Sequence, residues 1–189
     1  MTLTELLKRT RSFPSFDRSV PVTREDLAGL VACVRYAPSS MNAQMLKFRP
    51  VTDTAECEAV LAATRWAAKL PQLKLPPEGH EPPAYLILCA DRSVLPNADK
   101  FDTDVGIAAE VLMLAATERG LGGCILGSFN RAEIAKLLSN HVVPKLVLAI
   151  GHPDERVELT DPAPDGSVTY FRRDGIHYVE KRRTEELLL

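Results

Sequence analysis

The sequence of 189 residues suits one compact domain, and its 46% hydrophobic and 25% charged residues are ordinary for a globular protein. The net charge is −2 and the basic residues are scattered, which argues against a nucleic-acid-binding surface. Since the sequence shows neither a bilayer-spanning run nor a signal-peptide core, we expect a cytoplasmic protein that binds no membrane.

In the N-terminal third, Thr23 and Asp26 form a capping box, which predicts the start of a helix. Apolar residues follow at helical spacing, and Pro38 is expected to end this helix. Residues 48–51 predict a short strand. Because Pro50 has no amide donor, this strand should lie at a sheet edge or a bulge.

The middle of the chain predicts a helix over residues 54–69 and a buried strand over the apolar run 84–90. Between them, residues 71–83 contain five prolines and must form a loop, either a cover over a site or interface or a plain connector. A strong helix is expected from Asp104 through Arg119. Gly120 fits the position that follows its C-terminal end.

In the last third, strands are expected over residues 124–129 and 145–150, with a short helix capped by Asn130 between them. A turn at Asp165-Gly166 and a short helix from Thr184 complete the chain. Because strands and helices mix without strict alternation, the predicted class is α+β, with one sheet and helices packed on it.

The cysteines and histidines indicate neither a disulfide framework nor a metal site. The cysteines are widely spaced without a Cys-x-x-Cys pair, and the histidines lack metal-ligand spacing. No nucleophile-elbow motif is present either. We therefore expect no disulfide and no metal, with Cys89 and Cys124 buried in the core. The residues concerned are Cys33, Cys57, Cys89, Cys124, His80, His141, His152 and His177.

The glycine-rich segment 120–127 does not match the common nucleotide-binding motifs. Ile125 stands where the dinucleotide fingerprint needs its third glycine, and Ser128-Phe129 replaces the Lys-Ser/Thr of a phosphate-binding loop. Two interpretations stay open. The glycines form a helix cap with a tight turn, or they let the backbone approach a flat ligand.

Residues 37–44 carry two hydroxyls and two amides, which can hydrogen-bond phosphate, ribityl hydroxyls or a pyrimidine edge. A capped turn explains the same residues. Arg11-Ser12 means little alone, and the basic cluster 181–183 is either a solvated face or a phosphate site.

Taken in order, five segments resemble the nitroreductase family over nearly the whole chain. Arg11-Ser-Phe-Pro-Ser-Phe-Asp17 is similar to the family's Arg-Ser-x-Arg-x-Phe-Asp, and Pro38-Ser-Ser-Met-Asn-Ala-Gln44 is similar to Pro-Ser-x-x-Asn-x-Gln. The others are Asp104–Ala109 leading to Gly120–Cys124, the strand Val147–Pro153 ending in Gly-His-Pro, and Gly175–His177 running to Lys181-Arg182.

The resemblance implies a single nitroreductase-like domain, residues 1–189, with a central, mostly antiparallel sheet flanked by helices. It also implies an intertwined homodimer with FMN at the interface and a tail, about residues 165–189, that wraps the partner subunit. Arg11 and Ser12 would hold the flavin on its phosphate side, and Lys181 and Arg182 would neutralise the phosphate. Gly122 and Gly123 would line the ring, and the partner would contribute Pro38, Ser39, Ser40 and Asn42, with Gln44 in the same motif.

The implied function is an FMN-dependent oxidoreductase in which NADH or NADPH reduces the flavin and a nitroaromatic, quinone or similar acceptor follows in a ping-pong order. The flavin carries the chemistry, so no catalytic side chain is expected. A flavin-binding sensor or carrier is the alternative, because Pro14 stands where the family has Arg or Lys. Lys47 and Arg49 are candidates to supply the missing charge.

Overall fold

The computed structural model describes residues 1–67 and 73–189 and has a central antiparallel sheet of five strands. The strand order is β1-β5-β3-β2, and β4 also pairs with β5. This arrangement confirms the predicted α+β class. The strands are β1 (Phe16–Asp17), β2 (Leu46–Val51), β3 (Ala84–Asp91), β4 (Gly122–Leu126) and β5 (Val142–Pro153).

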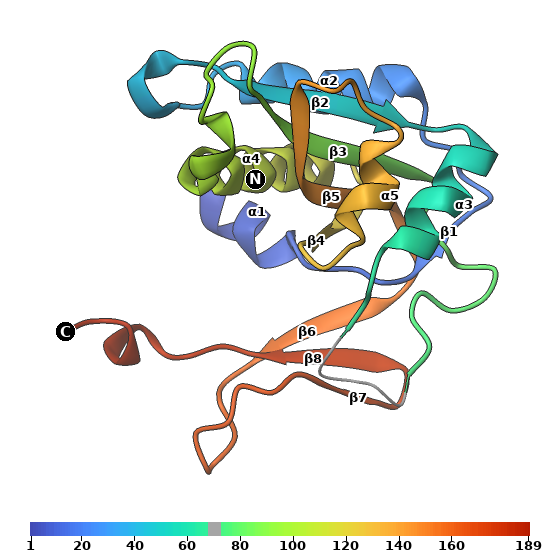
Figure 1. The fold of residues 1–189 in the computed structure, drawn as a ribbon. Coiled ribbons are helices and arrows are strands. Elements are labelled where there is room, and N and C mark those ends of the chain that lie inside the picture. Colours follow the sequence, from blue (N-terminus) through green and yellow to red (C-terminus); the bar gives the residue numbers. More distant parts are fainter. Residues whose placement is uncertain (68–72) are drawn as a thin grey trace.

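Strand β3 is buried along its whole length because helices cover both faces of the sheet (Figure 1). Leu86 and Leu88 point to the face covered by α2 (Arg24–Val34) and α4 (Asp102–Glu118). Tyr85 and Ile87 point to the opposite face. That face is covered by α3 (Thr54–Ala63) and α5 (Arg131–Ala135). Alternate residues of the strand therefore enter different cores, which explains why its sequence is continuously apolar.

The helix starts predicted at Thr23 and Asn130 are confirmed. Helix α4 starts at Asp102, two residues before the predicted Asp104, and two other helices end earlier than predicted. Thr23 Oγ1 accepts a hydrogen bond from the Asp26 amide at 3.1 Å, and the Asn130 side chain accepts from two first-turn amides of α5. Helix α2 ends at Val34, before Pro38 is reached, and α3 ends at Ala63. The remainder of the helix expected to residue 69 falls partly outside the described residues. Each described helix is too short or too polar to cross a bilayer.

Two strands of the central sheet, β5 and β4, begin and end at other residues than predicted. Strand β5 spans 12 residues, because it pairs with β3 along one edge and with both β4 and β1 along the other. Strand β4 begins and ends earlier than expected, and residues 127–129 leave it as a connector. Strand β2 is the edge strand that Pro50 predicts, paired only with β3 among the described residues.

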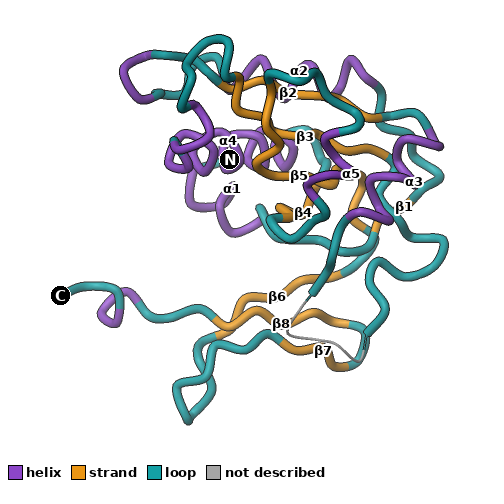
Figure 2. Tube along the Cα trace, in the orientation of Figure 1, coloured by secondary structure: helices purple, strands orange, loops and turns teal. Residues whose placement is uncertain are grey.

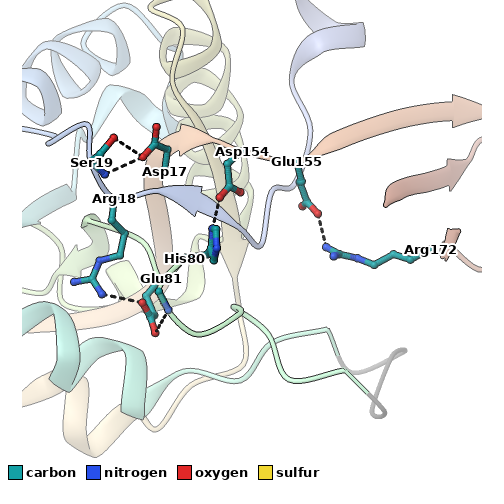
Figure 3. Close-up of polar contacts among 9 residues, drawn as sticks. Asp17, Arg18, Ser19, His80, Glu81, Asp154, Glu155 and Arg172 are labelled. Atoms are coloured by element: carbon teal, nitrogen blue, oxygen red, sulfur yellow. Dashed lines mark hydrogen bonds and ion pairs between the residues drawn. The ribbon is translucent and has the colours of Figure 1, made fainter. Parts of the chain in front are cut away.

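A second, three-stranded sheet follows the central one and was not predicted. It has the order β6-β8-β7, with β6 and β8 parallel. Asp154 pairs with His80, and Glu155 pairs with Arg172 of β7, at the point where the chain passes from β5 to β6 (Figure 3). These pairs help to fix the second sheet beside the main body (Figure 2). Its strands are β6 (Arg156–Thr160), β7 (Phe171–Arg173) and β8 (Ile176–Glu180).

The two termini are short helical turns without buried residues. Helix α1 (Leu3–Arg9) begins at a capping box formed by Thr2 and Glu5, and it lies against α4 near the N-terminus. The 3-10 helix η3 (Thr184–Glu186) is the short helix expected from Thr184. Beyond it the chain points away from the body (Figure 1).

Candidate functional site

The segment that follows α1 lies alongside β4. The Phe13 amide donates to the carbonyl of Gly123 at 2.9 Å, and Ser12 forms a parallel bridge with the same residue. This pairing holds Arg11 and Ser12 beside the start of β4. The segment after α3 is held on the other side, because the Arg65 amide donates to the Ser128 carbonyl at 2.9 Å.

These two segments, the end of β4 and one face of β8 enclose a cavity of about 410 Å³, named here the β4 cavity. Its volume falls within the range of about 300–1,000 Å³ that is usual for small-molecule sites. The lining residues are Arg11, Ser12, Pro14, Arg65, Trp66, Ala67, Leu75, residues 124–128, Tyr170, His177, Val179 and Lys181.

The charged lining of the β4 cavity is entirely basic. Arg11, Arg65 and Lys181 contribute to its wall, and no described lining residue carries a carboxylate. The Arg11 Nη2 donates to the Leu7 carbonyl at 2.6 Å, but its Nε is buried without a partner among the described residues. Burial lowers the pKa of Arg11, partly offset by Glu110, yet an arginine stays charged at neutral pH. The cavity therefore favours an anion.

Side chains alternate between the two faces of β8 and the residues that follow it, and this separates Lys181 from Arg182, the two predicted phosphate ligands. His177, Val179 and Lys181 line the β4 cavity because residues two apart share one face of an extended chain. Arg182 is outside the lining and pairs with Glu186 at 3.8 Å. Of the two predicted phosphate ligands, only Lys181 lies at the cavity.

Gly122 and Gly123 also lie outside the lining, and the reason for these glycines is internal packing. A Cβ atom at Gly122 would meet Pro153 Cγ at 2.4 Å and Phe13 Cδ2 at 2.6 Å. A Cβ atom at Gly123 would meet the carbonyl oxygen of Ala149 at 2.5 Å. The wall of the cavity is made instead by residues 124–128, which the sequence interpretation missed.

The predicted polar loop lines a different cavity. Pro38, Ser39, Asn42 and Gln44 contribute to a space of about 300 Å³ beside α2 and α4, named here the 38–44 cavity. It shares no lining residue with the β4 cavity. Within one chain, the two predicted groups of flavin ligands therefore remain apart.

Ser40 has a structural contact rather than a place in the 38–44 cavity. Its Oγ donates to Asp104 Oδ1 at 2.6 Å and its amide donates to Oδ2 at 2.9 Å. The Asp104 carboxylate is buried near the start of α4. This anchor holds a loop in which Met41, Asn42 and Gln44 all have positive φ angles near 50°. Such non-glycine conformations are costly and persist where the surrounding structure imposes them.

Neither candidate for the charge missing at Pro14 lies at the β4 cavity. Pro14 itself lines the cavity. Arg49 forms an ion pair with Glu56 at 2.7 Å, and Lys47 lies 4.0 Å from Asp91, and neither residue lines this cavity. Arg65 is the cation that the sequence interpretation missed, since no local motif marks it.

The remaining predicted chemistry is consistent with unreactive thiols. All four cysteines are unpaired, and burial raises the pKa of Cys57 to about 11 and that of Cys89 and Cys124 to about 12. Within residues 1–67 and 73–189, no group of three or more His, Cys, Asp or Glu side chains could hold a metal ion.

Comparison with known proteins places these features in a family. The model of the nitroreductase family matches residues 7–152, which end just before the second sheet. An FMN reductase [NAD(P)H] from Bacillus subtilis (strain 168) is 28% identical over 180 residues, covering 82% of this chain and 69% of the relative.

Two solved structures share the fold. A nitroreductase family protein from Streptococcus pneumoniae TIGR4 aligns with a TM-score of 0.68 and 19% identity, covering 87% of this chain and 96% of that one. An FMN-dependent nitroreductase from Clostridium difficile R20291 aligns with a TM-score of 0.65 and 22% identity, covering 82% and 89%. The family match spans most of the chain and all but the last residue of the central sheet, so the protein belongs to the nitroreductase family.

Proposed function

We propose that this protein binds FMN in the β4 cavity and uses it to pass a hydride from NADH or NADPH to an electron-poor acceptor such as a nitroaromatic or a quinone. The observation that carries the proposal is the cavity's lining, which has three cations and no carboxylate in the described residues. A relative 28% identical is an FMN reductase [NAD(P)H], which supports the same cofactor and electron donor.

The residues of the cavity fit the chemistry of FMN. Arg11 has a buried Nε without a partner among the described residues, and Ser12 and Lys181 add further donors toward the phosphate. Trp66, Ile125 and Leu126 supply flat and apolar surface that suits an aromatic ring. When bound, FMN supplies the hydride-accepting chemistry, and the protein supplies binding, orientation and exclusion of water.

The separation of the two cavities supports a site that a second copy of the chain completes. The partner's 38–44 cavity would bring its amides and hydroxyls to the exposed side of the β4 cavity. Tyr36, just before this loop, and Met41, within it, are 82% and 74% exposed in the single chain. In such a dimer the partner would cover these two side chains. The donor and the acceptor would then use one site in turn, which gives a ping-pong order.

The matched pair Lys181→Ala and Arg182→Ala tests the site. Lys181 lines the cavity and Arg182 does not, so the first change should weaken FMN binding about tenfold, as expected for a lost charge-assisted contact. The second change should have little effect. Quenching of flavin fluorescence measures both affinities. Equal losses in the two variants, or no loss in either, would remove Lys181 from the site.

A flavin-binding sensor or carrier is a second candidate, favoured by Pro14 in the cavity wall where the family has a basic residue. Excess NADPH added without air distinguishes the two functions. Bleaching of the bound flavin supports the oxidoreductase, and a flavin that stays yellow supports the sensor or carrier.

A further inference from the structure

We propose that His177 is a ligand-binding residue of the β4 cavity, whose imidazole hydrogen-bonds the flavin end of bound FMN and not its phosphate. This inference rests on the proposed function and adds a residue to it. The observation that carries it is a buried side chain without a protein partner. His177 is 8% exposed and lines the cavity, and neither ring nitrogen has a hydrogen-bond partner among the described residues.

The described protein groups around His177 leave both of its ring nitrogens without a hydrogen-bond partner. Tyr170 packs edge-on against the imidazole, with ring centroids 5.4 Å apart and an interplanar angle of 64°. Trp66, in the same cavity, already donates its indole N–H to Thr64 Oγ1 at 3.0 Å. Buried polar atoms are normally satisfied, so two unpartnered nitrogens on a ring that lines a cavity indicate that a bound molecule provides the partner.

The imidazole is neutral at neutral pH, which sets what it can recognise. Burial, together with Arg172 on the neighbouring strand β7, lowers the pKa of His177. A neutral imidazole has one N–H donor and one acceptor nitrogen. The ring edge of a flavin presents carbonyl oxygens and both donor and acceptor nitrogens. The imidazole therefore matches the ring edge, whereas a phosphate offers mainly acceptors and is served by the cations.

The geometry of the strand places His177 away from the phosphate ligand. Lys181 follows His177 by four residues on the same face, which is a separation of roughly 13 Å along an extended chain. One phosphate group cannot bridge that separation, but a phosphate joined by a five-carbon chain to an aromatic ring can extend along it. Pro14, also in the wall, has no side-chain donor. His177 thus supplies a polar contact that Pro14 cannot make.

The test compares His177→Phe with Lys181→Ala, using FMN and riboflavin as separate probes. Fluorescence titration should show that His177→Phe weakens both ligands about tenfold, because the lost hydrogen bond lies on the part they share. Lys181→Ala should weaken FMN alone, because riboflavin has no phosphate. The variant His177→Gln keeps a side-chain donor and acceptor, so it should stay within about threefold of the native affinity.

The melting temperature of the flavin-free protein separates ligand binding from a structural role. Because His177 leaves two buried nitrogens unpaired, His177→Phe should melt at the native temperature or higher. A lower melting temperature, an unchanged affinity for both flavins, a loss confined to FMN, or a Gln variant as weak as Phe would each overturn the proposal. If the native protein binds neither flavin, the proposed function fails as well. If the native protein binds flavin and the His177 variants bind FMN and riboflavin as tightly as it does, this inference fails while the proposed function stands.

Discussion

Gly123 tests whether the glycines of β4 serve packing or the flavin. A Cβ atom added there would lie 2.5 Å from the Ala149 carbonyl oxygen and 3.0 Å from both Ile150 Cδ1 and Met113 Sδ. The carbonyl belongs to β5, which is paired with β4 in the central sheet, so it cannot move without disturbing the strand pairing. Overpacking of this kind costs about 1–3 kcal/mol.

We therefore expect Gly123→Ala to lower the melting temperature of the flavin-free protein by roughly 2–12 °C, since about 2–4 °C is lost per kcal/mol in a chain of this size. Circular dichroism during heating measures the change. Gly29→Ala is the matched control. It lies in α2, where an added Cβ meets nothing within 4 Å, so it should stabilise the protein by up to about 1 kcal/mol. A Gly123→Ala protein with native melting but weak flavin binding would refute the packing explanation.

Two further predictions concern carboxylates outside the cavity. Burial, opposed by Arg172, raises the pKa of Glu155 to about 7, so the folded protein binds this proton more tightly than the unfolded chain. Stability should therefore fall as the pH rises from 5 to 8, and Glu155→Gln should reduce that fall by on the order of 3 kcal/mol in urea titrations. An unchanged pH dependence would show that Glu155 is not responsible. Ser40→Ala should cost about 1–3 kcal/mol in the same assay, because it removes a hydrogen bond to the buried Asp104 carboxylate. Ser39→Ala should be nearly neutral, since Ser39 Oγ makes only a 3.3 Å contact, and equal losses in both variants would contradict the assignment.

The parts of the fold that local patterns determine were predicted well. The capping residues Thr23 and Asn130 begin helices, and the run 84–90 forms a strand buried on both faces. The second sheet was missed because its strands are short, partly polar and paired over long sequence distances. Strand β5 was underestimated for a similar reason. Its first residues pair with the end of β3 and its last residues pair with β4 and β1, which no local pattern indicates.

The residues of the candidate site also fall into those that the sequence predicted and those that it did not. Arg11, Ser12 and Lys181 were predicted from the family pattern, and the structure brings them to one cavity. Arg65 carries no local signature, and His177 was noted only as part of the C-terminal family segment, because only the packing of distant segments places these two residues at the cavity. The alternation 177, 179, 181 is a sequence signal that could have separated Lys181 from Arg182, had the strand β8 been expected.

The visible absorption spectrum of the purified protein, recorded after incubation with excess FMN and desalting, tests the central claim most directly. The proposed site predicts retained flavin bands in proportion to the number of chains, with the bands lost in Arg11→Ala if that side chain holds the phosphate. A desalted protein without any flavin absorption would contradict FMN binding. The β4 cavity would then have to bind some other anion, and the oxidoreductase proposal would fall while the fold and family remain.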